Sequence, residues 1–132
     1  MLKPQNMGKS ESILSRMTVG DMSLHELRGA NIMRNREYPN TDKLDLSFRG
    51  LEFAGEAGEL VSKVKKLVRL RLNVPGNSQP GHNQIIADIE DELGDAMATL
   101  DLLAMELDID LARVTREKFN KVSAKLGLKT TL

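Results

Sequence analysis

Apolar residues recur every three or four positions along four separate stretches of the chain, and this spacing predicts amphipathic α-helices. The first predicted helix runs from residue 24 to about 36 and begins at a capping box, since Ser23 can accept from the Glu26 backbone N–H while Glu26 reaches back. The other helices are expected at about 45–72, at about 84–107, and from the cap Asp110 to Gly127. Segment 73–83 carries two prolines and two glycines and is expected to form a loop.

No stretch alternates between polar and apolar residues as a strand does, so the predicted fold class is all-α, a four-helix bundle. Four short apolar arcs leave room for a partner subunit, and we expect homo-oligomerisation to complete the bundle. A length of 132 residues fits one domain, with a flexible polar arm at 1–20 before the helical domain at 21–132. The predicted buried residues of the last helix are Leu111, Val114, Phe119, Val122 and Leu126.

Composition narrows the class of protein. The 19 basic and 19 acidic residues give a net charge of zero, which argues against a protein that coats a nucleic acid polymer. With no cysteine, thiolate nucleophiles and disulfides are excluded. No apolar run is long enough to span a membrane and the start lacks the apolar region of a signal peptide, so we expect a cytoplasmic protein.

Acidic side chains form the clearest chemical pattern. The second predicted helix carries three acids and two lysines at steps of three and four, which places them on one line: Glu52, Glu56, Glu59, Lys63 and Lys66. Glu92 and Asp95 form a second acidic pair, three residues apart, on the third helix. Neighbouring like charges repel, and a divalent cation among them removes that cost. Four hard oxygen donors from two facing helices would suit Mg²⁺, or Mn²⁺ in its place.

The same acids have a plainer interpretation, because paired glutamates are common on solvated helix faces. Three glycines beside them favour a specific role. Gly55, Gly58 and Gly94 lie inside predicted helices, where each costs about 1 kcal/mol relative to alanine. We interpret their lack of a Cβ as permitting close helix approach, which would bring the two acidic pairs together.

Three strings of the sequence resemble the MazG-like all-α nucleoside triphosphate pyrophosphatases: Leu51-Glu52-Phe53-Ala54-Gly55-Glu56-Ala57-Gly58-Glu59-Leu60, Asp91-Glu92-Leu93-Gly94-Asp95-Ala96 and Leu107-Asp108-Ile109-Asp110-Leu111. The resemblance covers about residues 24 to 132. It implies Mg²⁺-dependent cleavage of a (deoxy)nucleoside triphosphate between the α and β phosphates, which releases the monophosphate and pyrophosphate. By position it implies that Glu56, Glu59, Glu92 and Asp95 hold the metal.

This chain departs from that family in two ways. Many members carry two adjacent glutamates where Gly55-Glu56 stands here, so either Glu56 or Glu52 could be the catalytic carboxylate that activates water. The 32 residues between Glu59 and Glu92 also make a long intervening segment, which suggests a phage-type member that processes one particular deoxynucleotide. We lean toward a deoxypurine triphosphate such as dGTP.

Cations and amides provide candidate contacts to such a substrate. Lys63 and Lys66 continue the acidic stripe and are predicted to bind phosphate. By resemblance, the cluster near the C-terminus is also assigned to phosphate, through Lys118, Lys121 and Lys125, with Asn120 toward the nucleoside. Along the first helix the apolar face turns polar, and the resemblance to related enzymes implies that residues there contact base and sugar: Asn31, Arg34 and Tyr38.

Each of these residues also fits a helix surface or helix end that simply meets water. A non-catalytic helical oligomerisation module therefore competes with the enzyme hypothesis, as does a nucleotide sensor without turnover. For the enzyme we expect a nucleoside triphosphate substrate, a homodimer or homotetramer, and neither a membrane nor a nucleic acid polymer as partner.

Overall fold

The computed structural model describes residues 21–76 and 80–132, and these form four α-helices, one 3-10 helix and no strand. The elements in order are α2 (Leu24–Glu37), η1 (Thr41–Lys43), α3 (Leu46–Arg71), α4 (His82–Glu106) and α5 (Leu111–Lys125). The predicted all-α fold is confirmed. The arm expected at 1–20 lies outside the described residues. Over the described residues, no helix combines the length and the apolar character needed to cross a lipid bilayer.

The helix ends follow from local side-chain chemistry. At the start of α2, the Glu26 N–H donates to Ser23 Oγ at 3.1 Å and the Ser23 N–H donates to a Glu26 carboxylate oxygen at 2.6 Å. The Asp110 carboxylate accepts from the Arg113 N–H at 3.0 Å and so caps α5. Gly127, with a φ of +68°, follows the last turn in the left-handed region that favours glycine. These predicted caps are confirmed, and α4 begins two residues before the expected position.

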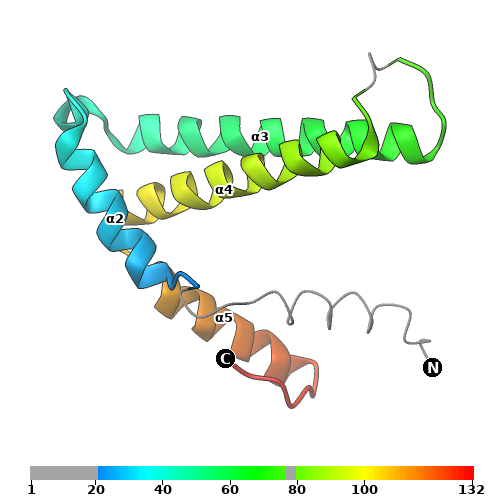
Figure 1. Cartoon of the computed structure of the whole chain (residues 1–132). Helices are drawn as coiled ribbons and strands as arrows, with labels where there is room; N and C mark the ends of the chain where they lie inside the picture. The colour runs from blue at the N-terminus through cyan, green and yellow to red at the C-terminus, as the bar shows by residue number, and fades with distance from the viewer. Residues whose placement is uncertain (1–20, 77–79) are drawn as a thin grey trace.

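The two long helices α3 and α4 lie side by side as an antiparallel hairpin (Figure 1). Helix α2 packs against α4 at the end of the hairpin where α3 begins and α4 ends. Helix α5 packs against α2 and diverges from the hairpin. The buried apolar residues of the described chain belong to the hairpin: Leu67 of α3 and Ile85, Leu102 and Ala104 of α4.

Several apolar residues that the helical pattern predicts to be buried are exposed in the single chain. Phe119 is 42% exposed, Val122 40% and Leu126 64%, so the prediction that they are core residues of α5 is wrong for the single chain. The hairpin helices also leave apolar residues of their helical pattern exposed: Val61 of α3 is 66% exposed and Leu93 of α4 is 52% exposed. The physical reason is that no described element packs over these faces.

Candidate metal centre and adjoining pocket

Three carboxylates from the two long helices converge on one face of the hairpin. Glu56 of α3 and Glu92 and Asp95 of α4 each offer an oxygen within 4.8 Å of the other two. Glu92 and Asp95 share a face of α4 because they lie three residues apart, and the antiparallel packing brings Glu56 opposite them. In an octahedral Mg²⁺ site with bonds of about 2.1 Å, adjacent ligand oxygens are about 3.0 Å apart and opposite ones about 4.2 Å. Side-chain rotations that draw the three oxygens closer together would let them hold one hard divalent cation.

The electrostatics of this cluster favour a cation. Partial desolvation raises the pKa of Glu56, and the negative charges of Glu59, Asp95, Glu92 and Glu52 raise it further, in that order. Glu59, one turn along α3, is exposed and lies outside the three-oxygen group, although its charge acts on Glu56. The charged form of Glu56 is thus disfavoured, and a bound cation would reverse this effect.

Lys63 lies beside the cluster. Its Nζ is 3.7 Å from a carboxylate oxygen of Asp88 and 3.9 Å from one of Glu92. The side chain predicted to contact phosphate therefore stands at the edge of the acidic group, where it balances part of its charge. Lys66, also predicted to bind phosphate, is half-buried about one turn further along α3.

A pocket of about 370 Å³ opens beside the cluster, between α2, the η1 segment, the first half of α3 and the end of α4. Its walls include three of the four residues predicted to contact the nucleoside, Asn120 being the exception, together with Glu52, which lies one turn before Glu56 on α3. Glu52 therefore stands between the pocket and the carboxylate cluster. The lining residues are Asn31, Arg34, Asn35, Tyr38, Thr41, Leu44, Phe48, Arg49, Glu52 and Leu102.

Arg49 is a pocket residue that the sequence did not single out. It is 3% exposed, its Nη1 donates to Glu52 Oε2 at 3.2 Å, and its Nη2 donates to Asn35 Oδ1 at 2.8 Å. Its guanidinium carbon lies 5.8 Å from the centre of the Phe48 ring, within reach of a cation–π interaction. Its Nε is buried with no hydrogen-bond partner among the described residues. Arg49 therefore fixes two polar walls of the pocket, Glu52 and Asn35.

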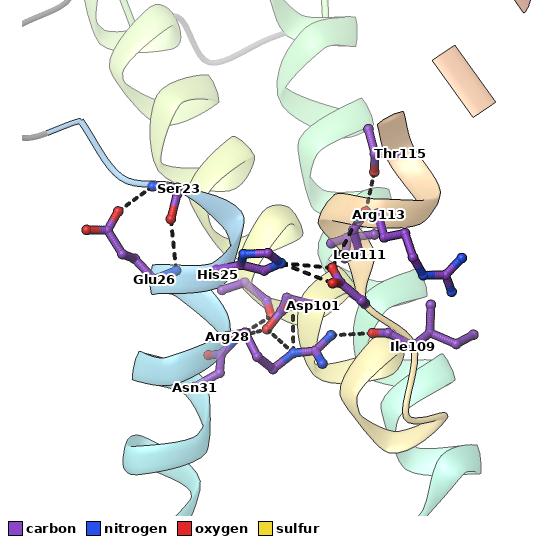
Figure 2. Close-up of polar contacts among 12 residues, drawn as sticks. Ser23, His25, Glu26, Arg28, Asn31, Asp101, Ile109, Leu111, Arg113 and Thr115 are labelled. Atoms are coloured by element: carbon purple, nitrogen blue, oxygen red, sulfur yellow. Dashed lines mark hydrogen bonds and ion pairs between the residues drawn. The ribbon is translucent and has the colours of Figure 1, made fainter. Parts of the chain in front are cut away.

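A buried network centred on Asp101 holds Asn31, one of the residues that line the pocket (Figure 2). This residue is 0% exposed, and its carboxylate accepts from Arg28 Nε at 3.0 and 3.2 Å and from Asn31 Nδ2 at 2.9 Å. Arg28 Nη2 also donates to the Ile109 carbonyl at 2.7 Å, so the network joins α2, α4 and the segment before α5. The available sequence signal was an acid inside the apolar run Leu100-Asp101-Leu102-Leu103.

The glycines beside the acids do not act as expected. A Cβ built on Gly55, Gly58 or Gly94 would meet no atom within 4 Å, so close helix approach within this chain does not require them. That interpretation is corrected, because the contact between α3 and α4 lies elsewhere on the helix surfaces. The space beside these glycines is open in the single chain.

The residues assigned on α5 lie apart from the cluster in the single chain. Helix α5 diverges from the hairpin, none of its residues lines the pocket, and its three lysines are exposed: Lys118, Lys121 and Lys125. Asn120 instead bonds to the backbone of Leu132, donating from Nδ2 to the carbonyl at 3.2 Å and accepting from the N–H at 2.8 Å. Within a single chain these four side chains are not brought to the carboxylates.

Comparison of the sequence with known proteins finds a phage relative. No protein-family model matches the chain. Over 92 residues the chain is 35% identical to the Gene 37 protein of Mycobacterium phage L5, an alignment that covers 67% of this chain and 75% of the phage protein. The chain therefore belongs to the family of this Gene 37 protein.

Proposed function

We propose that this protein is a Mg²⁺-dependent nucleotide pyrophosphohydrolase that cleaves a (deoxy)nucleoside triphosphate to the monophosphate and pyrophosphate. The observation that carries the proposal is the convergence of Glu56, Glu92 and Asp95 within 4.8 Å, beside a pocket lined by polar and aromatic side chains. The resemblance to MazG-like pyrophosphatases, described above on the sequence strings, agrees with both features.

The charges explain why a divalent cation is needed. A triphosphate carries about four negative charges and would be repelled by three carboxylates unless a cation lay between them. Glu56, Glu92 and Asp95 would hold Mg²⁺, or Mn²⁺ in its place, with Glu59 one turn away on the same stripe. Bound there, the metal would polarise the α-phosphoryl group and neutralise its developing charge.

The chain's own side chains would supply the remaining steps. Glu56 has no ion-pair partner within the described chain, whereas Glu52 is held by Arg49. This difference favours Glu56 over Glu52 as the group that accepts the proton of the attacking water, through the carboxylate oxygen that it would not offer to the metal. Lys63, which stands at the edge of the cluster, is placed to exchange its carboxylate contacts for a phosphate oxygen. Tyr38 and Asn31 would then contact the sugar and base in the pocket.

The test is an assay of the purified protein with Mg²⁺ and each of the eight common ribo- and deoxyribonucleoside triphosphates. We expect monophosphate and pyrophosphate with one preferred substrate, whereas diphosphate and orthophosphate would contradict the proposed bond. Glu92→Gln should abolish turnover. Glu90→Gln, an exposed position on the same helix, is the matched control and should retain it. Equal activity in the two variants would reject the assigned metal site.

We also propose that the active form is a homodimer or homotetramer. The exposed apolar faces of α5 and of the hairpin favour it, because apolar surface of this kind is stabilised by contact with a second copy. A second copy could also supply the α5 lysines that one chain leaves distant. The alternative, a non-catalytic oligomerisation module, rests on these same faces, and it predicts a melting temperature that does not respond to millimolar Mg²⁺. A nucleotide sensor would be stabilised by ligand without releasing product.

A further inference from the structure

Two asparagines one turn apart on α2, Asn31 and Asn35, line the pocket with opposite hydrogen-bonding polarity. An amide side chain carries a donor end and an acceptor end, and rotating it by half a turn exchanges them. Each of these amides contacts a charged partner that can only accept or only donate. The charged partners therefore fix both orientations, and the pocket presents one defined pattern.

Asn31 must present its oxygen. Its Nδ2 donates to the Asp101 carboxylate at 2.9 Å and to the Ala98 carbonyl at 3.2 Å, and neither of these groups has a hydrogen to give back. The Asn31 oxygen therefore points away from Asp101. It accepts from Arg34 Nη2 at 3.3 Å, and a carbonyl oxygen has a second lone pair. Asn31 lines the pocket although it is 2% exposed, and because its Nδ2 is held by Asp101 and Ala98, the oxygen is the end of this amide left for a ligand.

Asn35 must present its nitrogen. Arg49 Nη2 donates to Asn35 Oδ1 at 2.8 Å, and a guanidinium has no acceptor, so the opposite orientation would set two donors against each other. The Asn35 Nδ2 makes no hydrogen bond with any residue that the structure describes. Asn35 is half-buried in the wall of the pocket, which leaves a donor one helical turn from the Asn31 acceptor.

We propose that Asn31 Oδ1 and Asn35 Nδ2 together read the edge of a nucleobase, with Asn31 accepting from a base N–H and Asn35 donating to the neighbouring base acceptor. Phe48 and Tyr38, which also line the pocket, offer aromatic surface to a planar ring. A phosphate group fits this pair poorly, because its oxygens only accept and would face the Asn31 oxygen. The inference rests on the proposed function only in taking the ligand to be a nucleotide.

Replacing Asn35 by aspartate would change the hydrogen-bonding pattern of the pocket. In Asn35→Asp, one carboxylate oxygen keeps the bond to Arg49, now as an ion pair, and the other oxygen replaces the Nδ2 donor with an acceptor. The pocket would then present two neighbouring acceptors, the Asn31 oxygen and this carboxylate oxygen, which match a base with two neighbouring donors. Among the four common bases only guanine has such donors, at its ring N1–H and its 2-amino group. The substitution should therefore shift the preference of the pocket toward guanine.

Equilibrium binding tests this without turnover, because monophosphates are not hydrolysed in the proposed reaction. Titration of the protein in millimolar Mg²⁺ with dAMP, dCMP, dGMP and dTMP, by calorimetry or NMR, gives a Kd for each. For Asn35→Asp we expect the ratio of each other Kd to that of dGMP to rise at least about tenfold over the wild-type ratio, the size expected when a pocket group is left unpaired. Ratios are used because an added negative charge weakens every phosphate ligand equally. Asn40→Asp, an exposed position outside the pocket, adds the same charge as the matched control and should leave the ratios unchanged.

A second variant keeps the test independent of how well Asn35→Asp folds. Asn35→Ala removes the donor without adding an acceptor, and it should weaken the preferred monophosphate about tenfold without a shift toward dGMP. Unchanged ratios in Asn35→Asp, or wild-type protein that binds no monophosphate, would overturn the inference. If wild-type protein binds monophosphates selectively but releases no pyrophosphate from triphosphates, the proposed function fails and the inference stands.

Discussion

Replacing the fully buried Asp101 by asparagine should be among the most destabilising conservative changes in this chain. The substitution keeps the volume but removes the charge that faces Arg28, and its amide group meets the Asn31 NH2 on the other side. One of the two contacts must then place donor against donor. Because Asp101 joins α2 to α4, the loss falls on the packing that positions the pocket.

The size of the effect follows from burial. Removing one partner of a buried ion pair costs about 3–5 kcal/mol in unfolding free energy. The Arg28 side chain is 21% exposed, so water recovers part of this, and we expect about 2–4 kcal/mol for Asp101→Asn. Arg113→Gln is the matched control, because it breaks an ion pair with Glu117 in which both side chains are more than half exposed. That change should cost less than about 1 kcal/mol.

Urea unfolding followed by far-ultraviolet circular dichroism, at one fixed protein concentration, measures both values. A double-mutant cycle with Arg28→Met isolates the pair, and we expect a coupling of about 1–3 kcal/mol. If Asp101→Asn unfolds with the same free energy as Arg113→Gln, the buried network does not hold α2 against α4 and the reasoning is refuted.

Three further changes test other parts of the structure. Glu56→Gln removes one of several neighbouring negative charges, so it should raise the melting temperature in EDTA and abolish any rise caused by Mg²⁺; an unchanged Mg²⁺ response would contradict the metal assignment. The pKa of Glu56 is raised, so the folded state binds the proton of this carboxyl more tightly than the unfolded chain does. Without metal, the contribution of Glu56 to stability should therefore fall as the pH rises from 4.5 through the folded pKa. In a pH titration of the unfolding free energy, Glu56→Gln should remove this fall. Hydrogen bonds from the Arg113 N–H and from His25 lower the pKa of Asp110. The contribution of Asp110 to stability should therefore be lost as the pH falls from 3.8 through the folded pKa, and Asp110→Asn should flatten the acidic part of the same titration. Gly94→Ala should stabilise the protein by about 0.5–1 kcal/mol in chemical unfolding, since a Cβ there meets nothing within 4 Å, and a loss of stability would show that a second copy occupies that space.

The helices were predictable because their signals are local. Capping side chains such as Ser23 and Asp110 act within four residues, and the spacing of apolar residues reports the helical period directly. Which apolar face becomes buried is a different question, because the answer depends on elements far away in the chain or in another copy. Phe119 and Val61 follow the helical pattern yet remain exposed, since no described element reaches them.

The candidate site likewise combines features that follow from local sequence patterns with features that depend on residues far apart in the chain. The acidic stripe on α3 and the pair on α4 are local patterns, and antiparallel packing of two long helices was enough to bring Glu56 to Glu92 and Asp95. The polarity of the pocket could not be predicted in this way. Asn31 takes its orientation from Asp101, 70 residues later, and Asn35 takes its orientation from Arg49, 14 residues later. A sequence can therefore nominate an amide for recognition, whereas the group that the amide presents to a ligand is decided by charges that only the folded chain places behind it.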